Sequence, residues 1–174
     1  TSGDTGSAVA NGFYGVEGIN VIILYPSNKI SNIQEKQIST LDKNIFSLEV
    51  EGNFDDCQQL VKKAFLDKKL NSIIPLSSAN SINISRLIPQ TFYYFFAYSQ
   101  LKKKAPITFS VPSGNFGNLT AGIISKKMGL PVEKFIASTN SNDVVPEYLK
   151  THIYSPKPSL PTISNAMDVG DPSN

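Results

Sequence analysis

The sequence has few of the residues that build metal sites and disulfides. It holds one cysteine, Cys57, one histidine, His152, and no tryptophan. A lone cysteine excludes an internal disulfide, and one cysteine with one histidine cannot supply the usual ligands of a structural zinc site. Catalysis by a Ser-His-Asp triad would have to use His152 alone. The sequence therefore predicts no metal and a reducing, cytoplasmic setting.

Charge of one sign and long apolar runs are also lacking. Sixteen Lys and Arg stand against fourteen Asp and Glu, and the lysine pairs at 62–63, 68–69 and 126–127 have acidic residues between them. This pattern creates no concentrated positive field, so we expect neither a nucleic-acid nor a membrane partner. No apolar run approaches the roughly 18 or more residues that a membrane span needs, and the polar start of the chain has no signal-peptide core. The missing initiator methionine indicates a piece of a longer chain.

What the sequence does have is an alternation of short apolar runs with longer amphipathic segments. Its 174 residues, 40% of them hydrophobic, suffice for one core. From residue 5 to about residue 154 the alternation is typical of βα units around a parallel sheet. Strands are expected at 20–25, 45–50, 72–76, 107–111 and 134–138. They predict an α/β fold with three αβα layers and a mainly parallel twisted sheet, which is Rossmann-like.

Helices are expected at 5–14, 31–41, 54–66, 84 or 89 to 103, and 118–128. In the helix at 54–66, Cys57 falls on the apolar face, which predicts a core thiol rather than a reactive one. Residues 1–150 would then be the α/β core. Residues 151–174 contain four prolines and are expected to form an irregular segment leading toward an absent C-terminal part. Helices that belong to absent parts would leave an apolar patch exposed, so we expect self-association.

The strongest local signal is the stretch VPSGNFGNLTAGIISKKMG at 111–129. The expected strand turns through Gly114, Asn115, Phe116, Gly117 and Asn118 directly into a helix. Two glycines three apart let consecutive N–H groups point at one spot, and the helix adds its positive end. This combination predicts an anion cradle suited to phosphate. It is neither a P-loop nor the dinucleotide fingerprint, and an ordinary Gly/Asn turn remains the alternative.

Two further loops have the polarity of anion sites. The segment TSGDTG at 1–6 precedes a helix of small residues, where hydroxyls and a helix N-terminus can hold a carboxylate or phosphate; capping of that helix is the alternative. The stretch LSSANSIN at 76–83 follows an expected strand and leads to Arg86, the only arginine beside fifteen lysines. A guanidinium suits bidentate contact with phosphate, and a surface ion pair is the alternative. Such loops at the carboxyl ends of parallel strands are where open α/β sheets bind ligands.

The chain resembles threonine synthase over nearly its whole length. The resemblance rests on the order and spacing of TSGDTGSAVANGF, VEGNFDDCQQLVKKAF, SSANSINISRLIPQ, VPSGNFGNLTAGIISKKMGLP and TISNAMDVGDPSN. Cysteine synthase and threonine deaminase have an asparagine in place of Asp4 and lack the SANSINISRLIPQ and GNFGN pairings. The resemblance implies a central fragment of a lyase of threonine biosynthesis with the fold of the tryptophan-synthase β-subunit. Such enzymes use pyridoxal 5'-phosphate to convert O-phospho-L-homoserine and water into L-threonine and phosphate.

The resemblance also implies roles for three sets of residues, carried over by motif. The cofactor phosphate would be held by Gly114, Asn115, Phe116, Gly117 and Asn118. The substrate's carboxylate and part of its phosphate would be taken by Thr1, Ser2, Asp4 and Thr5. The substrate phosphate would be held by Ser81 and Arg86, with help from Asn80 and Asn83.

The lysine that binds the cofactor as a Schiff base is missing from the chain. Family members place it in a Phe-Lys-Asp type motif some tens of residues before the TSGDTG segment, which stands here at residue 1. The lysines that are present lie in polar stretches, not in an apolar pocket that would make one a nucleophile. We therefore expect no catalytic residue in this chain, an inactive fragment, and the remainder of the parent chain as its partner. The alternative is a non-catalytic phosphate- or nucleotide-binding α/β module that kept the GNFGN loop.

Overall fold

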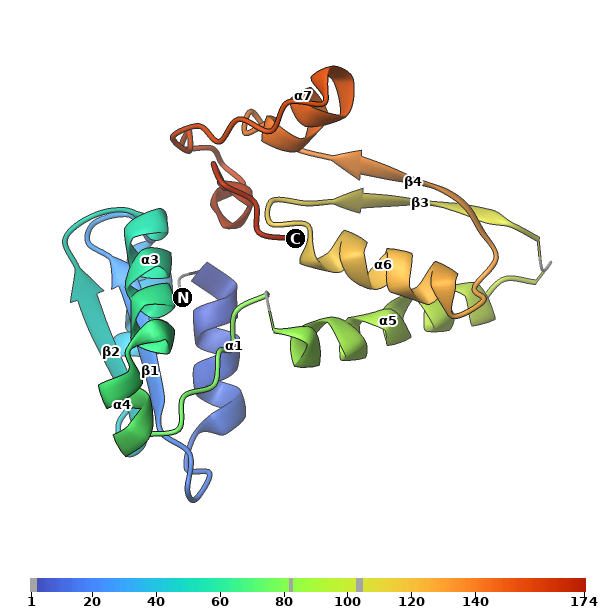
Figure 1. Cartoon of the computed structure of the whole chain (residues 1–174). Helices are drawn as coiled ribbons and strands as arrows, with labels where there is room; N and C mark the ends of the chain where they lie inside the picture. Colours follow the sequence, from blue (N-terminus) through green and yellow to red (C-terminus); the bar gives the residue numbers. More distant parts are fainter. Residues whose placement is uncertain (1–2, 82, 103–104) are drawn as a thin grey trace. The chain divides into compact units, whose positions relative to one another are not determined.

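The structure, a computed structural model, describes residues 3–81, 83–102 and 105–174. The chain divides into two compact units, Thr1–Ser77 and Ser78–Asn174. Each unit holds one pair of parallel strands with helices packed against it (Figure 1). The predicted α/β class and parallel pairing are confirmed. The described strands form two separate two-stranded sheets, however, where we expected a single larger one.

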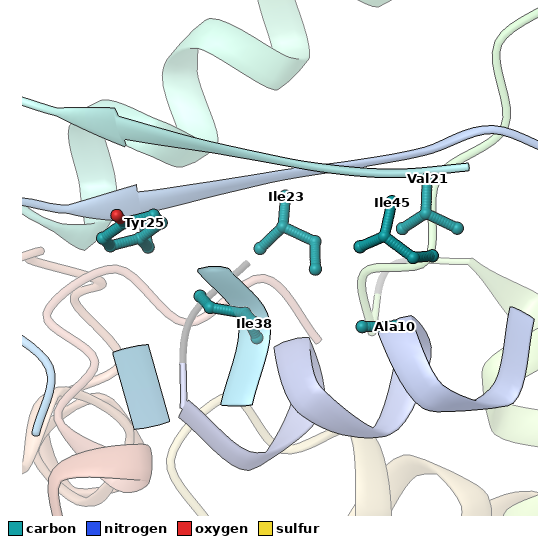
Figure 2. Close-up of a cluster of buried hydrophobic side chains, with 6 residues drawn as sticks. All are labelled: Ala10, Val21, Ile23, Tyr25, Ile38 and Ile45. Carbon is teal, nitrogen blue, oxygen red and sulfur yellow. The ribbon is translucent and has the colours of Figure 1, made fainter. Parts of the chain in front are cut away.

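The first unit is built around strands β1 and β2. Its elements are α1 (Gly3–Phe13), β1 (Val21–Pro26), α2 (Asn32–Ser39), β2 (Ile45–Val50), α3 (Phe54–Leu66) and α4 (Lys68–Ile73). Val21 lies opposite Ile45, so alternate residues of both strands share a face. Figure 2 shows that face packed against α1 and α2, with a core of Ala10, Val21, Ile23, Tyr25, Ile38 and Ile45. The opposite face stays half exposed at Ile22, Phe46 and Leu48.

Capping residues set the helix boundaries in this unit. Ser31 and Asn53 each form a capping box: the side chain of the cap accepts the backbone N–H of the residue three positions on, and the backbone N–H of the cap donates to that residue's side chain. Helix α3 therefore has the predicted bounds. Its Cys57 is 2% exposed, which confirms the predicted core position, and burial raises the pKa of this thiol.

The strand expected at 72–76 is wrong. Helix α4 occupies the first part of this range, and the chain from Ile74 to Ser77 is irregular. Asp67 caps α4 by accepting the N–H of Leu70 at 3.0 Å, and the Asn71 amide donates to the carbonyls of Ala64 and Phe65 at the end of α3. These local hydrogen bonds outweigh the β preference of two adjacent isoleucines, which have no neighbouring strand to pair with among the described residues.

The second unit is built around strands β3 and β4. Its elements are α5 (Ile84–Ser99), β3 (Ile107–Pro112), α6 (Gly117–Lys127), β4 (Val132–Ser138), α7 (Val144–Thr151) and the 3-10 turn η1 (Asn165–Met167). The core consists of Tyr94, Val111, Ala121, Leu130 and Val132. The Tyr94 ring meets the Phe109 ring edge-on, with 4.9 Å between centroids. Gly122 lets α6 approach this cluster, because a Cβ there would lie 2.7 Å from the Tyr94 ring.

Helix α7 is not among the helices expected from the sequence. It contains Pro146 in its first turn, where the missing N–H has no helical partner to lose, and it ends at His152 in the left-handed conformation. From Ile153 to Asn174 the only regular element is η1. None of the described helices combines the length and the apolar character that a membrane crossing requires.

Candidate functional site

The loop between β3 and α6 starts where both strands of the second unit end. The N–H of Ser113 donates to the carbonyl of Ser138 at 2.9 Å, which ties the loop to the end of β4. Asn118 closes the loop from the other side. Its Nδ2 donates to the Pro112 carbonyl at 2.7 Å, and its Oδ1 accepts the Ser113 hydroxyl at 2.7 Å. The contacts of Asn118 therefore join the two ends of the loop.

The unusual backbone angle in this loop belongs to Phe116 and not to a glycine. Phe116 has φ 59° in the left-handed region and its side chain is 5% exposed. Neither Gly114 nor Gly117 has a positive φ, which corrects the expectation that the glycines supply the tight curl. They are needed for close contact instead. A Cβ on Gly114 would lie 2.6 Å from the Cα of Met167, and one on Gly117 would lie 3.2 Å from the Cβ of Ser81.

Five consecutive backbone N–H groups of this loop, at residues 114–118, have no acceptor among the residues that the structure describes. Two of them belong to the buried residues Phe116 and Gly117. Buried N–H groups are nearly always paired, so a run without acceptors at a helix N-terminus indicates a place for an anion. The loop therefore offers N–H donors of the kind that a phosphate needs, and its role as the cofactor-phosphate cradle stays a prediction.

The SSANSIN stretch lies between α4 and α5 and does not follow a strand, which corrects its expected position. Asn83 caps α5 by accepting the Ser85 N–H at 3.0 Å, and its Nδ2 donates to the carbonyl of Ser78 at 2.6 Å. Asn80 accepts the N–H of Ser81 at 2.6 Å. Both asparagines thus shape the loop. A direct role for them in holding phosphate stays a prediction.

Arg86 stands in the first turn of α5 and is half buried. Its Nη1 donates to the carbonyl of Ala79, which turns the guanidinium toward the SSANSIN stretch. The ion pairs in the described part of the chain join Lys157 to Asp143 and Glu147 and leave Arg86 out. The alternative of a surface ion pair therefore finds no support there. A half-buried cation that has no carboxylate partner among the described side chains suits an anionic ligand.

The structure brings the glycine loop and the SSANSIN stretch into contact. The Nδ2 of Asn115 donates to the hydroxyl of Ser81 at 2.6 Å. The end of the described chain reaches the same place (Figure 1): Asn174 donates to the Ser81 hydroxyl at 3.2 Å and to the Asn115 carbonyl at 2.9 Å, and the N–H of Ser173 donates to Asn115 Oδ1 at 2.6 Å. The residues expected to hold two different phosphates thus touch each other.

The third expected loop, TSGDTG, belongs to the first unit. Thr1 and Ser2 lie outside the described residues, and so does the side chain of Asp4. Thr5 is half buried in the first turns of α1, and Gly6 beside it is buried. Their expected contact with the substrate carboxylate stays a prediction.

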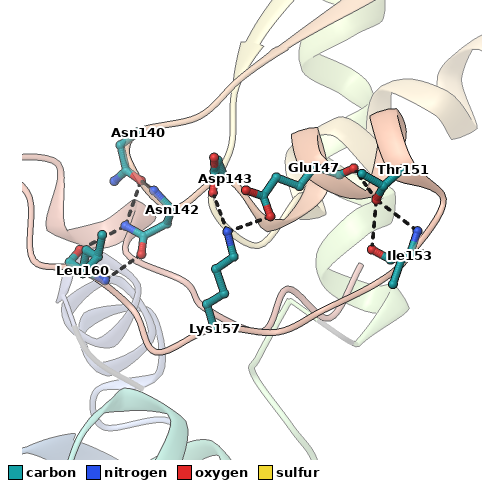
Figure 3. Close-up of polar contacts among 8 residues, drawn as sticks. All are labelled: Asn140, Asn142, Asp143, Glu147, Thr151, Ile153, Lys157 and Leu160. Atoms are coloured by element: carbon teal, nitrogen blue, oxygen red, sulfur yellow. Dashed lines mark hydrogen bonds and ion pairs between the residues drawn. The ribbon is translucent and has the colours of Figure 1, made fainter.

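Sequence reasoning missed a polar network that holds the irregular end of the chain. Asn140, just beyond β4, donates to the carboxylate of Asp168 at 2.8 Å, and Thr162 donates to the same carboxylate at 2.7 Å from its hydroxyl. Figure 3 shows the neighbouring contacts, in which Asn142 holds Leu160 and Lys157 lies 2.7 Å from Glu147 of α7. The signal that could have found it is the density of Asn, Ser, Thr and Asp at 138–143 and 162–168.

The comparisons with known proteins point in one direction. Threonine synthase of Haemophilus influenzae is 58% identical over 176 aligned residues, which cover all of this chain and 41% of that protein. The crystal structure of threonine synthase from Escherichia coli superposes with a TM-score of 0.93 at 55% identity, covering 99% of this chain and 41% of that one. The structure of PLP-bound threonine synthase from Brucella melitensis gives a TM-score of 0.84 at 41% identity, covering 100% of this chain and 38% of that one.

No protein-family model matches the chain. The chain spans about two fifths of the length of the curated relatives that it matches. Identity of this degree along all of its residues, with the same fold, leaves common descent as the explanation. The whole of this chain is therefore homologous to a segment of the threonine synthases.

Proposed function

We propose that this chain is part of a threonine synthase, a pyridoxal-phosphate-dependent lyase that converts O-phospho-L-homoserine and water into L-threonine and phosphate. The run of backbone N–H groups at 114–118, which have no acceptor among the described residues, carries the proposal, because it offers a phosphate the donors that it needs. The homology to threonine synthases, one of them with the cofactor bound, supports the same conclusion. A cytoplasmic enzyme acting on a small, soluble metabolite is part of this proposal.

The loop at 114–118 fits the cofactor phosphate. Its N–H groups and the positive end of α6 would share the phosphate charge, and Asn118 keeps the loop closed. The two glycines help to keep this shape because they have no Cβ: Met167 packs against Gly114, and Ser81 packs against Gly117, where a Cβ would otherwise lie. Bound pyridoxal phosphate supplies an electron sink for the removal of the substrate phosphate and the addition of water.

Arg86 and Ser81 would hold the substrate phosphate. The guanidinium stabilises the negative charge that grows on this phosphate as its bond to carbon breaks. Ser81 lies at the contact between the two loops, where its hydroxyl can turn between Asn80, Asn115 and a ligand. Thr1, Ser2, Asp4 and Thr5 would orient the substrate carboxylate. The cofactor-binding lysine is proposed to lie in the parent protein outside this chain.

The experiment that tests this proposal replaces Arg86 in the full-length enzyme. Arg86→Ala should lower kcat/KM for O-phosphohomoserine about 10- to 150-fold, because it removes a charge-assisted contact worth about 1.5 to 3 kcal/mol. Cofactor affinity, measured by absorbance titration, should stay within about twofold, since the hydrogen bond described for the Arg86 side chain goes to the Ala79 carbonyl and not to the loop at 114–118. Arg86→Lys keeps the charge and loses the planar guanidinium, so its kcat/KM should lie between those of the unsubstituted enzyme and Arg86→Ala.

Two results would contradict the assignment. Loss of cofactor with intact substrate kinetics in Arg86→Ala would mean that the two phosphate sites are exchanged. An unsubstituted full-length protein that neither traps pyridoxal phosphate with borohydride nor releases phosphate from O-phosphohomoserine would favour the non-catalytic phosphate-binding module.

A further inference from the structure

The irregular end of the chain lies on the glycine loop at two places. The backbone of Met167, in η1, packs so closely on Gly114 that a Cβ there would lie within 2.6 Å of it. The backbone of Ser173 and the side chain of Asn174 donate to Asn115 at 2.6 and 2.9 Å. The shape of the loop therefore depends on where residues 165–174 lie.

One carboxylate, that of Asp168, fixes this part of the chain immediately after η1. Its Oδ1 accepts from Asn140 at 2.8 Å and from the Thr162 hydroxyl at 2.7 Å, and its Oδ2 accepts the Thr162 N–H at 2.8 Å. The side chain of Asn142 adds a longer contact at 3.3 Å. Hydrogen bonds to a carboxylate are stronger than those between neutral groups, so this is a firm attachment.

The attachment point lies close to the loop in the fold. Asn140 follows β4 by two residues, and the last residue of β4, Ser138, accepts the N–H of Ser113 at the start of the loop. Asp168 precedes Val169, which is buried, and follows Met167, which touches Gly114. The Asn140–Asp168 contact thus joins the end of β4 to the segment that presses on the loop.

We propose that Asp168 and Asn140 are positioning residues for the phosphate cradle: they hold η1 and the chain end against Gly114 and Asn115, so that the N–H groups of 114–118 converge. Neither side chain would touch the cofactor. This inference rests on the proposed function, because it takes the ligand of the loop to be the phosphate of pyridoxal phosphate. Misplacement of a cradle by a fraction of an ångström weakens all of its donors together.

The test compares pyridoxal phosphate with 5′-deoxypyridoxal, the same aldehyde without the phosphate, in the full-length enzyme. Asp168→Ala and Asn140→Ala should each raise the dissociation constant of pyridoxal phosphate about tenfold. The dissociation constant of 5′-deoxypyridoxal should change less than about twofold, because the ring site is untouched. Asp168→Asn keeps an acceptor for Asn140 but sets an NH₂ group against the Thr162 N–H, so its effect should be smaller. Absorbance titration measures all of these constants.

Glu147→Gln is the matched control. It weakens the contact between Lys157 and α7 in the same segment without touching the loop, so it should leave the preference for the phosphate unchanged. Thermal unfolding of each apoenzyme shows which variants fold. If Asp168→Ala does not fold, Asp168→Asn is used for the test in its place. Equal weakening of both aldehydes, or weakening of neither, overturns the positioning role. An unsubstituted enzyme that binds both aldehydes equally overturns the phosphate assignment itself, and with it the proposed function.

Discussion

Phe116 shows at the scale of one residue how this loop differs from a simple glycine turn. A bulky residue in the left-handed region raises the free energy of the folded state by about 1 kcal/mol or more. Phe116 adopts this conformation, and its side chain is 5% exposed. Burial of a phenylalanine contributes about 2 to 3 kcal/mol, so packing outweighs the strain. The ring in the core and the strained backbone together fix the direction of the neighbouring N–H groups.

Cys57 allows a prediction at the same scale. Burial raises the pKa of its thiol, so the neutral form, which is a poor nucleophile, dominates at pH 7. We expect Cys57 in the folded full-length enzyme to resist iodoacetamide, and to react only when unfolding exposes it. Mass spectrometry after timed labelling, with and without urea, measures both rates. Labelling of Cys57 in the native protein as fast as a free thiol would contradict the buried position.

At the scale of elements, the junction of α3 and α4 shows how side chains of moderate propensity decide between helix and strand. Asn71 Nδ2 donates to the carbonyls of Ala64, Phe65 and Asp67 at 2.7 to 3.1 Å, which satisfies the end of α3 from within α4. One amide therefore ties two helices together. The Ile73-Ile74 pair, which suggested a strand, lies exposed at the end of this junction.

Replacing Asn71 tests this account of the junction. Asn71→Ala should lower the free energy of unfolding by about 1 to 2 kcal/mol, because several carbonyls at the end of α3 lose their partner. Ser72→Ala is the control: its exposed hydroxyl donates to the Lys69 carbonyl within the same helix, and its loss should cost less than about 0.5 kcal/mol. Urea unfolding of the full-length enzyme followed by circular dichroism gives both values. Equal effects of the two substitutions would argue against Asn71 as the link.

At the scale of the whole molecule, large apolar side chains stay exposed in both units. Ile22, Phe46 and Leu48 are exposed on one face of the β1–β2 sheet, and Phe92, Tyr93 and Phe96 are 63%, 73% and 67% exposed on α5. Contiguous apolar surface of this kind favours contact with other protein surface. The relatives are more than twice as long as this chain, so the parent protein is the expected source of that surface.

The 174-residue chain expressed alone should therefore self-associate and lack activity. We expect sedimentation velocity to show species larger than 19.0 kDa, and Phe96→Glu to reduce them by placing a charge in the exposed face of α5. No phosphate should be released from O-phosphohomoserine, because the chain has no lysine in the cofactor-binding motif. A monomer at all concentrations would refute the expected self-association. Turnover, or a cofactor trapped on one particular lysine, would refute the expected lack of activity.

Local patterns in the sequence were enough to predict most elements of this fold. Short runs of largely apolar character, rich in Val, Ile and Phe, predicted β1, β2, β3 and β4, because strands that helices cover have such sequences. The Asn53 cap and the aspartates after it marked α3. The GNFGN stretch predicted a loop with consecutive exposed N–H groups, because a strand there leads directly into a helix N-terminus. Each of these signals depends on neighbours within one turn or one strand.

Only the tertiary structure decided what depends on residues far apart in the chain. The packing of Met167 on Gly114, which leaves no room for a Cβ, could not be predicted from the sequence. The contact between Asn115 and Ser81 could not be predicted either. Nor could the sequence show that Asp168 holds Asn140, 28 residues away. Such contacts leave no periodic or spaced pattern, since they arise where two loops meet after the helices and strands have packed. The sequence by itself determined most of the elements and the position of the glycine loop, and the packing of irregular segments determined how that loop is shaped.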